Sequence, residues 1–123
     1  MNLVNILENI RQGSIWSLSG QKTLDDLNWS LENTTTKPTL EECQKYWNTH
    51  GTPYLMTLLR KERDKKLLDT DKYAIPDFGH PTDIVKQEWL TYRQALRNLP
   101  TTASPSLDAN GDLTNVTWPT PPS

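Results

Sequence analysis

Residues 54–100, YLMTLLRKERDKKLLDTDKYAIPDFGHPTDIVKQEWLTYRQALRNLP, decide the fold, because they hold the longest periodic segments of the chain and most of its basic residues. In the first half, apolar side chains recur at i, i+3 and i+4 and again two turns later. They are Leu55, Leu58, Leu59, Leu67 and Leu68. This spacing predicts a helix over residues 54–69 with one apolar face.

The second half carries a longer apolar stripe, which predicts a helix over residues 82–99. The stripe recurs every three or four residues and consists of Val85, Trp89, Tyr92, Leu96 and Leu99. Such a period keeps all five side chains on one side of a helix. We expect the two helices to pack antiparallel as a hairpin, with Leu59 in one cluster with Trp89 or Tyr92.

The connection between these helices, residues 70–81, contains residues that end or start helices. Thr70 and Asp71 should end the first helix, because their side chains compete for backbone hydrogen bonds. Pro76 favours an extended or turned backbone before it. Thr82 is expected to cap the second helix, and Pro100 should close it.

Residues 1–37 are expected to form an N-terminal β element. Ile15, Trp16 and Leu18 form a short strand candidate, and Leu27, Trp29 and Leu31 alternate with polar residues as a half-buried strand does. We expect these strands to pair antiparallel and to pack on a helix or on another protein, because two strands alone are marginally stable. Residues 1–12 fit either a short helix or an extended segment.

A polar linker, residues 32–37, leads to a short predicted helix over residues 39–50. Thr39 and Glu42 have the spacing of a capping box, and Gly51 and Pro53 should end this helix. The predicted domains are therefore the β element 1–37, a helical domain 38–100 and an extended proline-rich C-terminal arm 101–123. The expected fold class is α+β, mostly α.

The C-terminal arm is rich in Thr, Ser and Pro, and residues 113–118 can form one short strand. Trp118 is exceptional in such a segment, because a large aromatic side chain commonly marks a docking point. We expect the arm to dock on the chain's own helical hairpin or on a partner.

Composition limits the classes of function. At 123 residues and 34% hydrophobic content, the chain should bury only a thin core. The net charge of -2 and the pI near 5.6 argue against binding to nucleic acid. The N-terminus lacks a basic leader and no apolar run reaches the roughly 18–20 residues of a membrane span, so we expect a soluble protein used in a cytoplasm.

No residue pattern typical of catalysis, of a cofactor or of a metal site is found in the sequence. The single cysteine, Cys43, excludes an internal disulfide, and with His50 it supplies fewer ligands than a zinc site needs. His50 and His80 fit solvated loop positions. The aspartates near the loop, Asp71 and Asp77 among them, lack the EF-hand pattern. We therefore expect a non-enzymatic protein without a cofactor or metal.

An ordered series of short motifs within residues 59–100 matches a known family. The motifs are Leu59-Arg60, Arg63-Asp64, Leu67-Leu68, Thr70-Asp71, Tyr73, Pro76-Asp77-Phe78, Trp89, Tyr92 to Arg97 and Leu99-Pro100, followed later by Trp118-Pro119. The chain thereby resembles bacteriophage tail assembly chaperone and tail-fibre assembly proteins, including forms from phages of marine bacteria and cyanobacteria. It departs from many members in having Lys72-Tyr73 where they carry Trp directly after Thr-Asp.

The resemblance implies a phage protein that binds another tail or tail-fibre component, with a trimeric component among the alternatives. It would act as an assembly chaperone in the host cytoplasm, or remain in the virion tail as a minor structural subunit. A regulator or a small enzyme unrelated to tails is the alternative.

Tyr, Trp and Arg dominate the hot spots of protein interfaces, which selects the candidate binding residues. The candidates for partner binding are Trp16, Trp29, Tyr73, Phe78, Arg93, Arg97 and Trp118. Structural roles are expected for Arg63, Asp71, Asp77, Trp89 and Tyr92, with core packing favoured for the last two. Because Arg63 shares the apolar side of its helix, it is expected to pair with Asp71 or Asp77.

Overall fold

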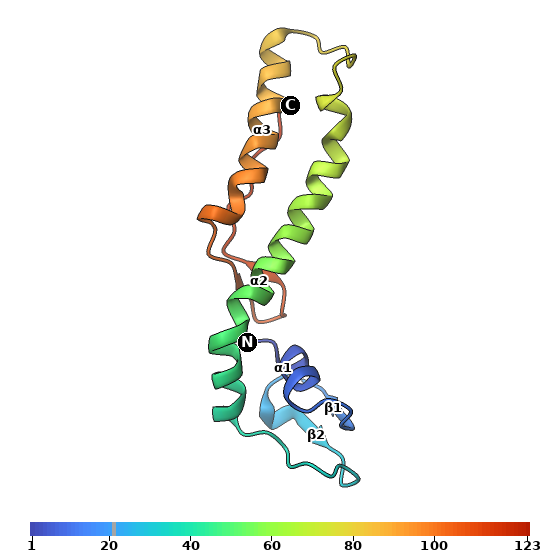
Figure 1. Cartoon of the computed structure of the whole chain (residues 1–123), viewed down its shortest axis with the longest axis vertical. Coiled ribbons are helices and arrows are strands. Elements are labelled where there is room, and N and C mark those ends of the chain that lie inside the picture. Colours follow the sequence, from blue (N-terminus) through green and yellow to red (C-terminus); the bar gives the residue numbers. More distant parts are fainter. Residues whose placement is uncertain (21) are drawn as a thin grey trace. The chain divides into compact units, whose positions relative to one another are not determined.

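A computed structural model describes residues 1–20 and 22–123, and its element order confirms the α+β, mostly α fold class (Figure 1). The described residues divide into two compact units. The first unit comprises residues 1–55 and 107–112, and the second comprises residues 56–106 and 113–123. The boundary between the two units lies inside the helix α2 (Leu40–Thr70) and not at a linker. A change in sequence composition therefore does not mark this boundary.

The first unit begins with a helix, α1 (Leu3–Ile10), which decides between the two alternatives for residues 1–12. The side chain of Asn2 caps it by accepting a hydrogen bond of 3.0 Å from the backbone N–H of Asn5. This bond satisfies one of the free N–H groups of the first turn. Ile6 and Leu7 are fully buried on the inner face of the helix.

The two tryptophan-containing strands pair antiparallel, as predicted. β1 (Trp16–Leu18) and β2 (Leu27–Trp29) place Trp16 opposite Trp29, and the short 3₁₀ helix η1 (Leu24–Asp26) lies between them. The expectation that Leu31 belongs to the second strand is wrong, because its side chain is fully exposed. The pairing stops earlier because the Asn33 amide bonds to the backbone N–H and C=O of Ile15, at 2.6 and 2.7 Å.

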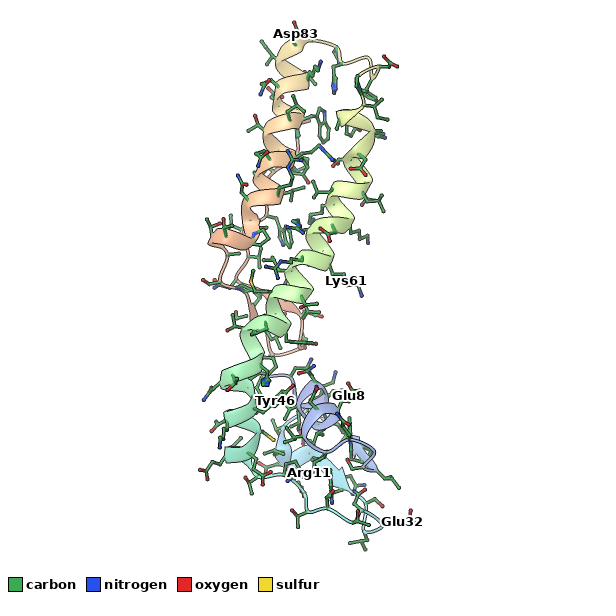
Figure 2. All side chains as sticks on the ribbon, viewed as in Figure 1. Glu8, Arg11, Glu32, Tyr46, Lys61 and Asp83 are labelled. Carbon is green, nitrogen blue, oxygen red and sulfur yellow. The ribbon has the colours of Figure 1, made fainter. Side chains whose placement is uncertain are left out.

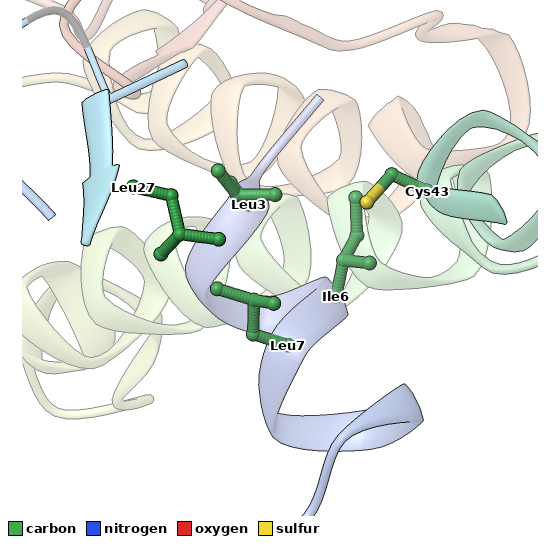
Figure 3. Close-up of a cluster of buried hydrophobic side chains, with 5 residues drawn as sticks. All are labelled: Leu3, Ile6, Leu7, Leu27 and Cys43. Carbon is green, nitrogen blue, oxygen red and sulfur yellow. The ribbon is translucent and has the colours of Figure 1, made fainter. Parts of the chain in front are cut away.

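The core of the first unit is small. It consists of Leu3, Ile6, Leu7, Leu27 and Cys43 (Figure 3). Half-buried tryptophans surround it. The guanidinium of Arg11, which is labelled in Figure 2, lies 2.6 Å from a Glu42 carboxylate oxygen and also donates to the carbonyl of Thr36. The β pair thus packs on helices of its own chain, which a two-stranded sheet requires.

The predicted break near Gly51 and Pro53 is wrong, because α2 runs from Leu40 to Thr70 with Pro53 inside it. Proline in a helix interior removes one hydrogen bond and costs roughly 3 kcal/mol. Packing on either side opposes this cost. Trp47 lies so close to Gly51 that a Cβ there would sit 2.6 Å from the indole, and the hydroxyl of Tyr54 accepts from the Asn2 side chain at 3.0 Å.

In the second unit, α3 (Asp83–Thr102) runs back antiparallel to the adjacent part of α2 (Figure 1). Thr82 caps α3 by accepting from the Val85 N–H at 3.2 Å, which confirms the predicted cap. Pro100 does not close the helix, since the chain remains helical to Thr102 and the Ala103 N–H still bonds to the Leu99 carbonyl. A proline near a helix end removes only its own N–H bond, so the last turn survives.

Few side chains are buried in the second unit. They are Leu59, Tyr92, Arg93, Leu96 and Leu99. Trp89 is half-buried, whereas Leu68 is 72% exposed although the sequence placed it on the apolar face. Each helical residue turns by about 100°, so Leu68 lies well round the helix from the half-buried Leu67.

The C-terminal arm contains less strand than expected. β3 (Ser106–Leu107) pairs with β4 (Leu113–Thr114), and the predicted strand over 113–118 ends after Thr114. Asn115 has a φ of 61°, which turns the chain, and its side chain donates to the Ser104 carbonyl at 2.8 Å. The left-handed backbone at Asn115 is incompatible with a continuing strand.

We predict that the thiol of Cys43 is protected in the native protein. Burial raises the pKa of Cys43, and the nearby Glu42 carboxylate raises it further, so the unreactive neutral thiol is favoured at neutral pH. Alkylation by iodoacetamide at pH 8 should be at least about a hundredfold slower in buffer than in urea, corresponding to roughly 3 kcal/mol for local opening. Equal rates in the two conditions would contradict the described core.

Candidate partner-binding site

A buried arginine joins the two helices of the second unit. One terminal nitrogen of Arg93 on α3 donates to the Leu67 carbonyl at 2.8 Å and to the Thr70 hydroxyl at 2.9 Å. The other donates to the Asp71 carboxylate at 2.7 Å. The guanidinium therefore engages the last turn of α2 and the residue that follows it.

This contact supplies hydrogen-bond donors and positive charge to the C-terminal end of α2. The last carbonyls of a helix lack partners within it and carry partial negative charge. A cation with several N–H donors in a fixed plane can satisfy a carbonyl, a hydroxyl and a carboxylate together. Because the Asp71 side chain is 56% exposed, its ion pair with Arg93 is screened, and the bonds to Leu67 and Thr70 should contribute more.

The expected tie from Arg63 to Asp71 or Asp77 is therefore wrong. Arg63 pairs with its neighbour Asp64, with a nitrogen to oxygen distance of 2.7 Å, while the carboxylate of Asp71 receives Arg93. The exposed Asp77 takes no part in this contact. Arg63 can swing toward its neighbour at the surface, so its charge needs no partner from the loop.

Next to these contacts of Arg93, which we call the Arg93 clamp, the 3₁₀ helix η2 (Asp71–Ala74) places the Tyr73 ring on α3. The rings of Tyr73 and Trp89 are stacked, with centroids 3.8 Å apart and planes 11° from parallel. Phe78 meets Tyr73 edge to face at 5.0 Å, and Tyr92 meets Trp89 in the same way at 5.8 Å. Aromatic pairs in these arrangements add to the stability gained from burial alone.

His80 belongs to this aromatic cluster, so the expectation of a solvated loop position is wrong. Its ring lies 4.7 Å from Phe78, and its Nε2 is 3.0 Å from the Tyr73 carbonyl. A carbonyl only accepts, so Nε2 carries the proton in this bond. Within the described residues, the buried Nδ1 has no hydrogen-bond partner. The sequence signal for His80 was its place two residues after Phe78 in a proline-bounded loop.

The aromatic cluster borders a cavity of about 770 Å³, which we call the aromatic groove. Its apolar lining includes Tyr73, Phe78, His80, Val85, Trp89 and Tyr92. The chain's own Pro121, Pro122 and Ser123 line it as well. An adjoining cavity of about 570 Å³, the α3 groove, is lined by Ile84, Thr91, Tyr92 and Ala95 together with Pro119 and Pro122.

Trp118, the aromatic residue predicted to dock the arm, is half-buried in the second unit. The Lys66 ammonium lies 5.0 Å from the centre of its ring, within the range of a cation–π contact. The sequence pointed to Trp118 but not to Lys66, because five basic residues between Arg60 and Lys66 look alike in sequence.

The other candidate residues line neither groove. Trp16 and Trp29 belong to the first unit, where Trp29 donates to the Thr35 carbonyl at 3.1 Å. Arg97 is exposed on α3 and donates to the Gln94 side chain at 2.8 Å. Arg93 faces α2 and acts within the fold. The structure thus brings together Tyr73 and Phe78 from the predicted set, and adds Trp89 and Tyr92 to them.

Two further features bear on chemistry. Among residues 1–20 and 22–123, no group of three or more His, Cys, Asp or Glu side chains is placed to hold a metal ion. None of the helices in this same part of the chain is both long and apolar enough to span a membrane.

Comparison with known families assigns the chain. The model of the phage tail assembly chaperone protein family matches residues 56–123, which is more than half of the chain. The chain belongs to this family. Its role is accordingly in the assembly of phage tails. No curated protein and no solved structure matches the chain.

The region matched to the phage tail assembly chaperone family contains the whole second unit, which also starts at residue 56, and in addition residues 107–112 of the first unit. It includes the Arg93 clamp, both grooves and Trp118. The β pair with Trp16 and Trp29 lies outside the match. The features shared with this family are therefore to be sought in the helical hairpin and the arm.

We predict that replacing Arg93 destabilises the second unit more than replacing any exposed arginine of α3. Arg93→Leu removes the charged donor to the Leu67 carbonyl, the Thr70 hydroxyl and the Asp71 carboxylate, and should lower the free energy of unfolding by roughly 2–3 kcal/mol. Asp71→Asn should cost less than about 1 kcal/mol, because that ion pair is exposed. Urea unfolding followed by circular dichroism measures both.

The matched control is Arg97→Leu, which removes a surface arginine one helical turn further along α3. Its expected effect is within about 0.5 kcal/mol. Equal losses of stability for Arg93→Leu and Arg97→Leu would contradict the assignment of the clamp.

Proposed function

We propose that the chain is a transient assembly chaperone, and that its second unit holds an apolar segment of a tail component in the two grooves. The single observation that carries this proposal is the pair of adjoining cavities, which share Tyr92 and Pro122. Stacked aromatic rings border one cavity and an apolar face of α3 borders the other. Such surfaces are suited to a polypeptide rather than to a charged small molecule.

Exposed apolar side chains around the grooves support the proposal. Ile84, which lines the α3 groove, is 72% exposed, and Ile75 in the loop is 54% exposed. Covering such side chains contributes about 25 cal/mol per Å² of apolar surface removed from water. A tail component that exposes a complementary apolar segment before assembly would be protected from aggregation while the grooves cover that segment.

The action we propose requires binding and release, without a catalytic step. A chaperone of this kind has to release its client when the client's permanent partners arrive, so its contacts should be apolar and modest in area. Tyr73, Phe78 and Trp89 are proposed to make these contacts, while Arg93 keeps the surface in place. The client is a phage tail protein; a tail-fibre component and a trimeric client are two forms it could take. The site of action is the infected host cell.

A minor structural subunit of the virion is the second candidate, favoured by the half-buried Trp118 in the arm. An arm anchored by an aromatic side chain can be a permanent connection as well as a temporary one. Mass spectrometry of purified particles separates the two. A transient chaperone should be absent from particles, whereas a structural subunit should be present in a fixed ratio to the other tail proteins.

The binding role predicts a solubility effect in co-expression. The tagged full-length chain, expressed together with the tail proteins of the same virus, should keep one of them soluble and recover it by affinity purification. Ile84→Glu places a charge in the α3 groove and should reduce recovery at least about fivefold, the loss expected when roughly 1 kcal/mol of apolar contact is removed.

Leu68→Glu is the matched control for this experiment, because Leu68 is also 72% exposed on a helix of the same unit but lines neither groove. It should leave recovery unchanged. The proposal fails if no tail protein is recovered, or if both variants lower recovery equally.

A further inference from the structure

The last six residues of the chain, Trp118 to Ser123, lie across the proposed binding surface, and we call this segment the strap. Pro119 and Thr120 line the α3 groove, Pro121 and Ser123 line the aromatic groove, and Pro122 lines both. The C-terminus accordingly lies beside α3, within the same unit (Figure 1). The strap thus forms part of the wall of both grooves, next to the surfaces that a client segment would contact.

The strap is held by side-chain contacts alone. Within the described residues, no hydrogen bond joins residues 116–123 to the remainder of the chain, and these residues belong to neither helix nor strand. Its defined attachment is the cation–π contact between Trp118 and Lys66. Contacts of this type contribute about 0.5–2 kcal/mol, so the strap should detach readily.

The chemistry of the strap matches the chemistry of the groove. Three of its six residues are proline, which fixes φ and favours an extended backbone with little conformational entropy to lose on binding. Aromatic-lined grooves bind such segments in other protein modules, since flat rings pack against proline. Here the facing rings include Trp89, Tyr92 and the stacked Tyr73.

We infer that the two grooves form a recognition site for an extended, proline-containing segment of a partner, and that the strap covers part of this site in the free chain. The inference rests on the proposed function, because the partner would be the tail component. A partner segment binds by displacing the strap. The strap shields the apolar surface until the partner is present.

Tethering makes the strap an effective competitor in spite of its weak attachment. A segment joined by a short flexible connection experiences an effective concentration of the order of millimolar. The apparent affinity of a partner segment for the intact chain is therefore its intrinsic affinity multiplied by the fraction of chains in which the site is open. Weakening the strap should strengthen binding of the partner, which is opposite to the usual effect of removing a contact.

The test uses the full-length chain and a fluorescent peptide with the sequence of residues 116–123, VTWPTPPS. Fluorescence anisotropy should show weak binding to the intact chain. Binding to the full-length Trp118→Ala variant should be about tenfold tighter, because its own strap no longer competes well while the peptide retains its tryptophan. Equal affinity for both chains, or no binding to either, overturns the inference.

Two controls make the result specific. A peptide in which the three prolines are replaced by alanine should bind the Trp118→Ala variant at least about fivefold more weakly, and equal binding would remove the role assigned to proline. Adding Lys66→Ala to that variant should weaken binding of the tryptophan-containing peptide, whereas adding Lys65→Ala should not. Equal effects of the two lysine changes would contradict the described strap position.

The outcome is separable from the proposed function. If a tail protein is recovered in co-expression and recovery depends on Ile84, but the peptide does not bind, the grooves bind a client of different chemistry and the strap inference alone fails. If the peptide binds and no tail protein is recovered, the recognition site stands and the chaperone proposal fails.

Discussion

The second unit depends on the contact between the Arg93 guanidinium and the C-terminal turn of α2. Few apolar side chains are buried between these helices, so their packing alone offers limited stabilisation. The arginine makes the arrangement of the two helices specific, because its N–H groups donate to the Leu67 carbonyl, the Thr70 hydroxyl and the Asp71 carboxylate at 2.7–2.9 Å. That geometry fixes where α2 ends relative to α3, and thereby where the following loop begins.

The proposed binding surface follows from that constraint. Because η2 starts directly after the turn of α2 that Arg93 contacts, the Tyr73 ring stacks on Trp89. Phe78 packs against Tyr73, and His80 packs against Phe78. The cluster is only partly covered by its own fold, which leaves the grooves open to a strap or a client.

Local patterns in the sequence predicted the features that depend on local physics. The strand pair of Trp16 and Trp29 and the cap at Thr82 were both predictable, since alternation and capping act within a few residues. Pro53 was misjudged because tertiary packing of its neighbours outweighs its helix-breaking effect. The choice of Arg93 over Arg63 depends on which helix face meets the other helix, and a single sequence does not specify this.

Nuclear magnetic resonance of the full-length chain tests most directly whether the clamp sets the binding surface. Stacking at 3.8 Å should give contacts between the Tyr73 and Trp89 ring protons and shift the Tyr73 ring signals upfield. We predict that Arg93→Leu abolishes both effects while circular dichroism still reports helices, and that Arg97→Leu preserves them. Unchanged Tyr73 signals in a folded Arg93→Leu variant would contradict the dependence of the aromatic cluster on Arg93.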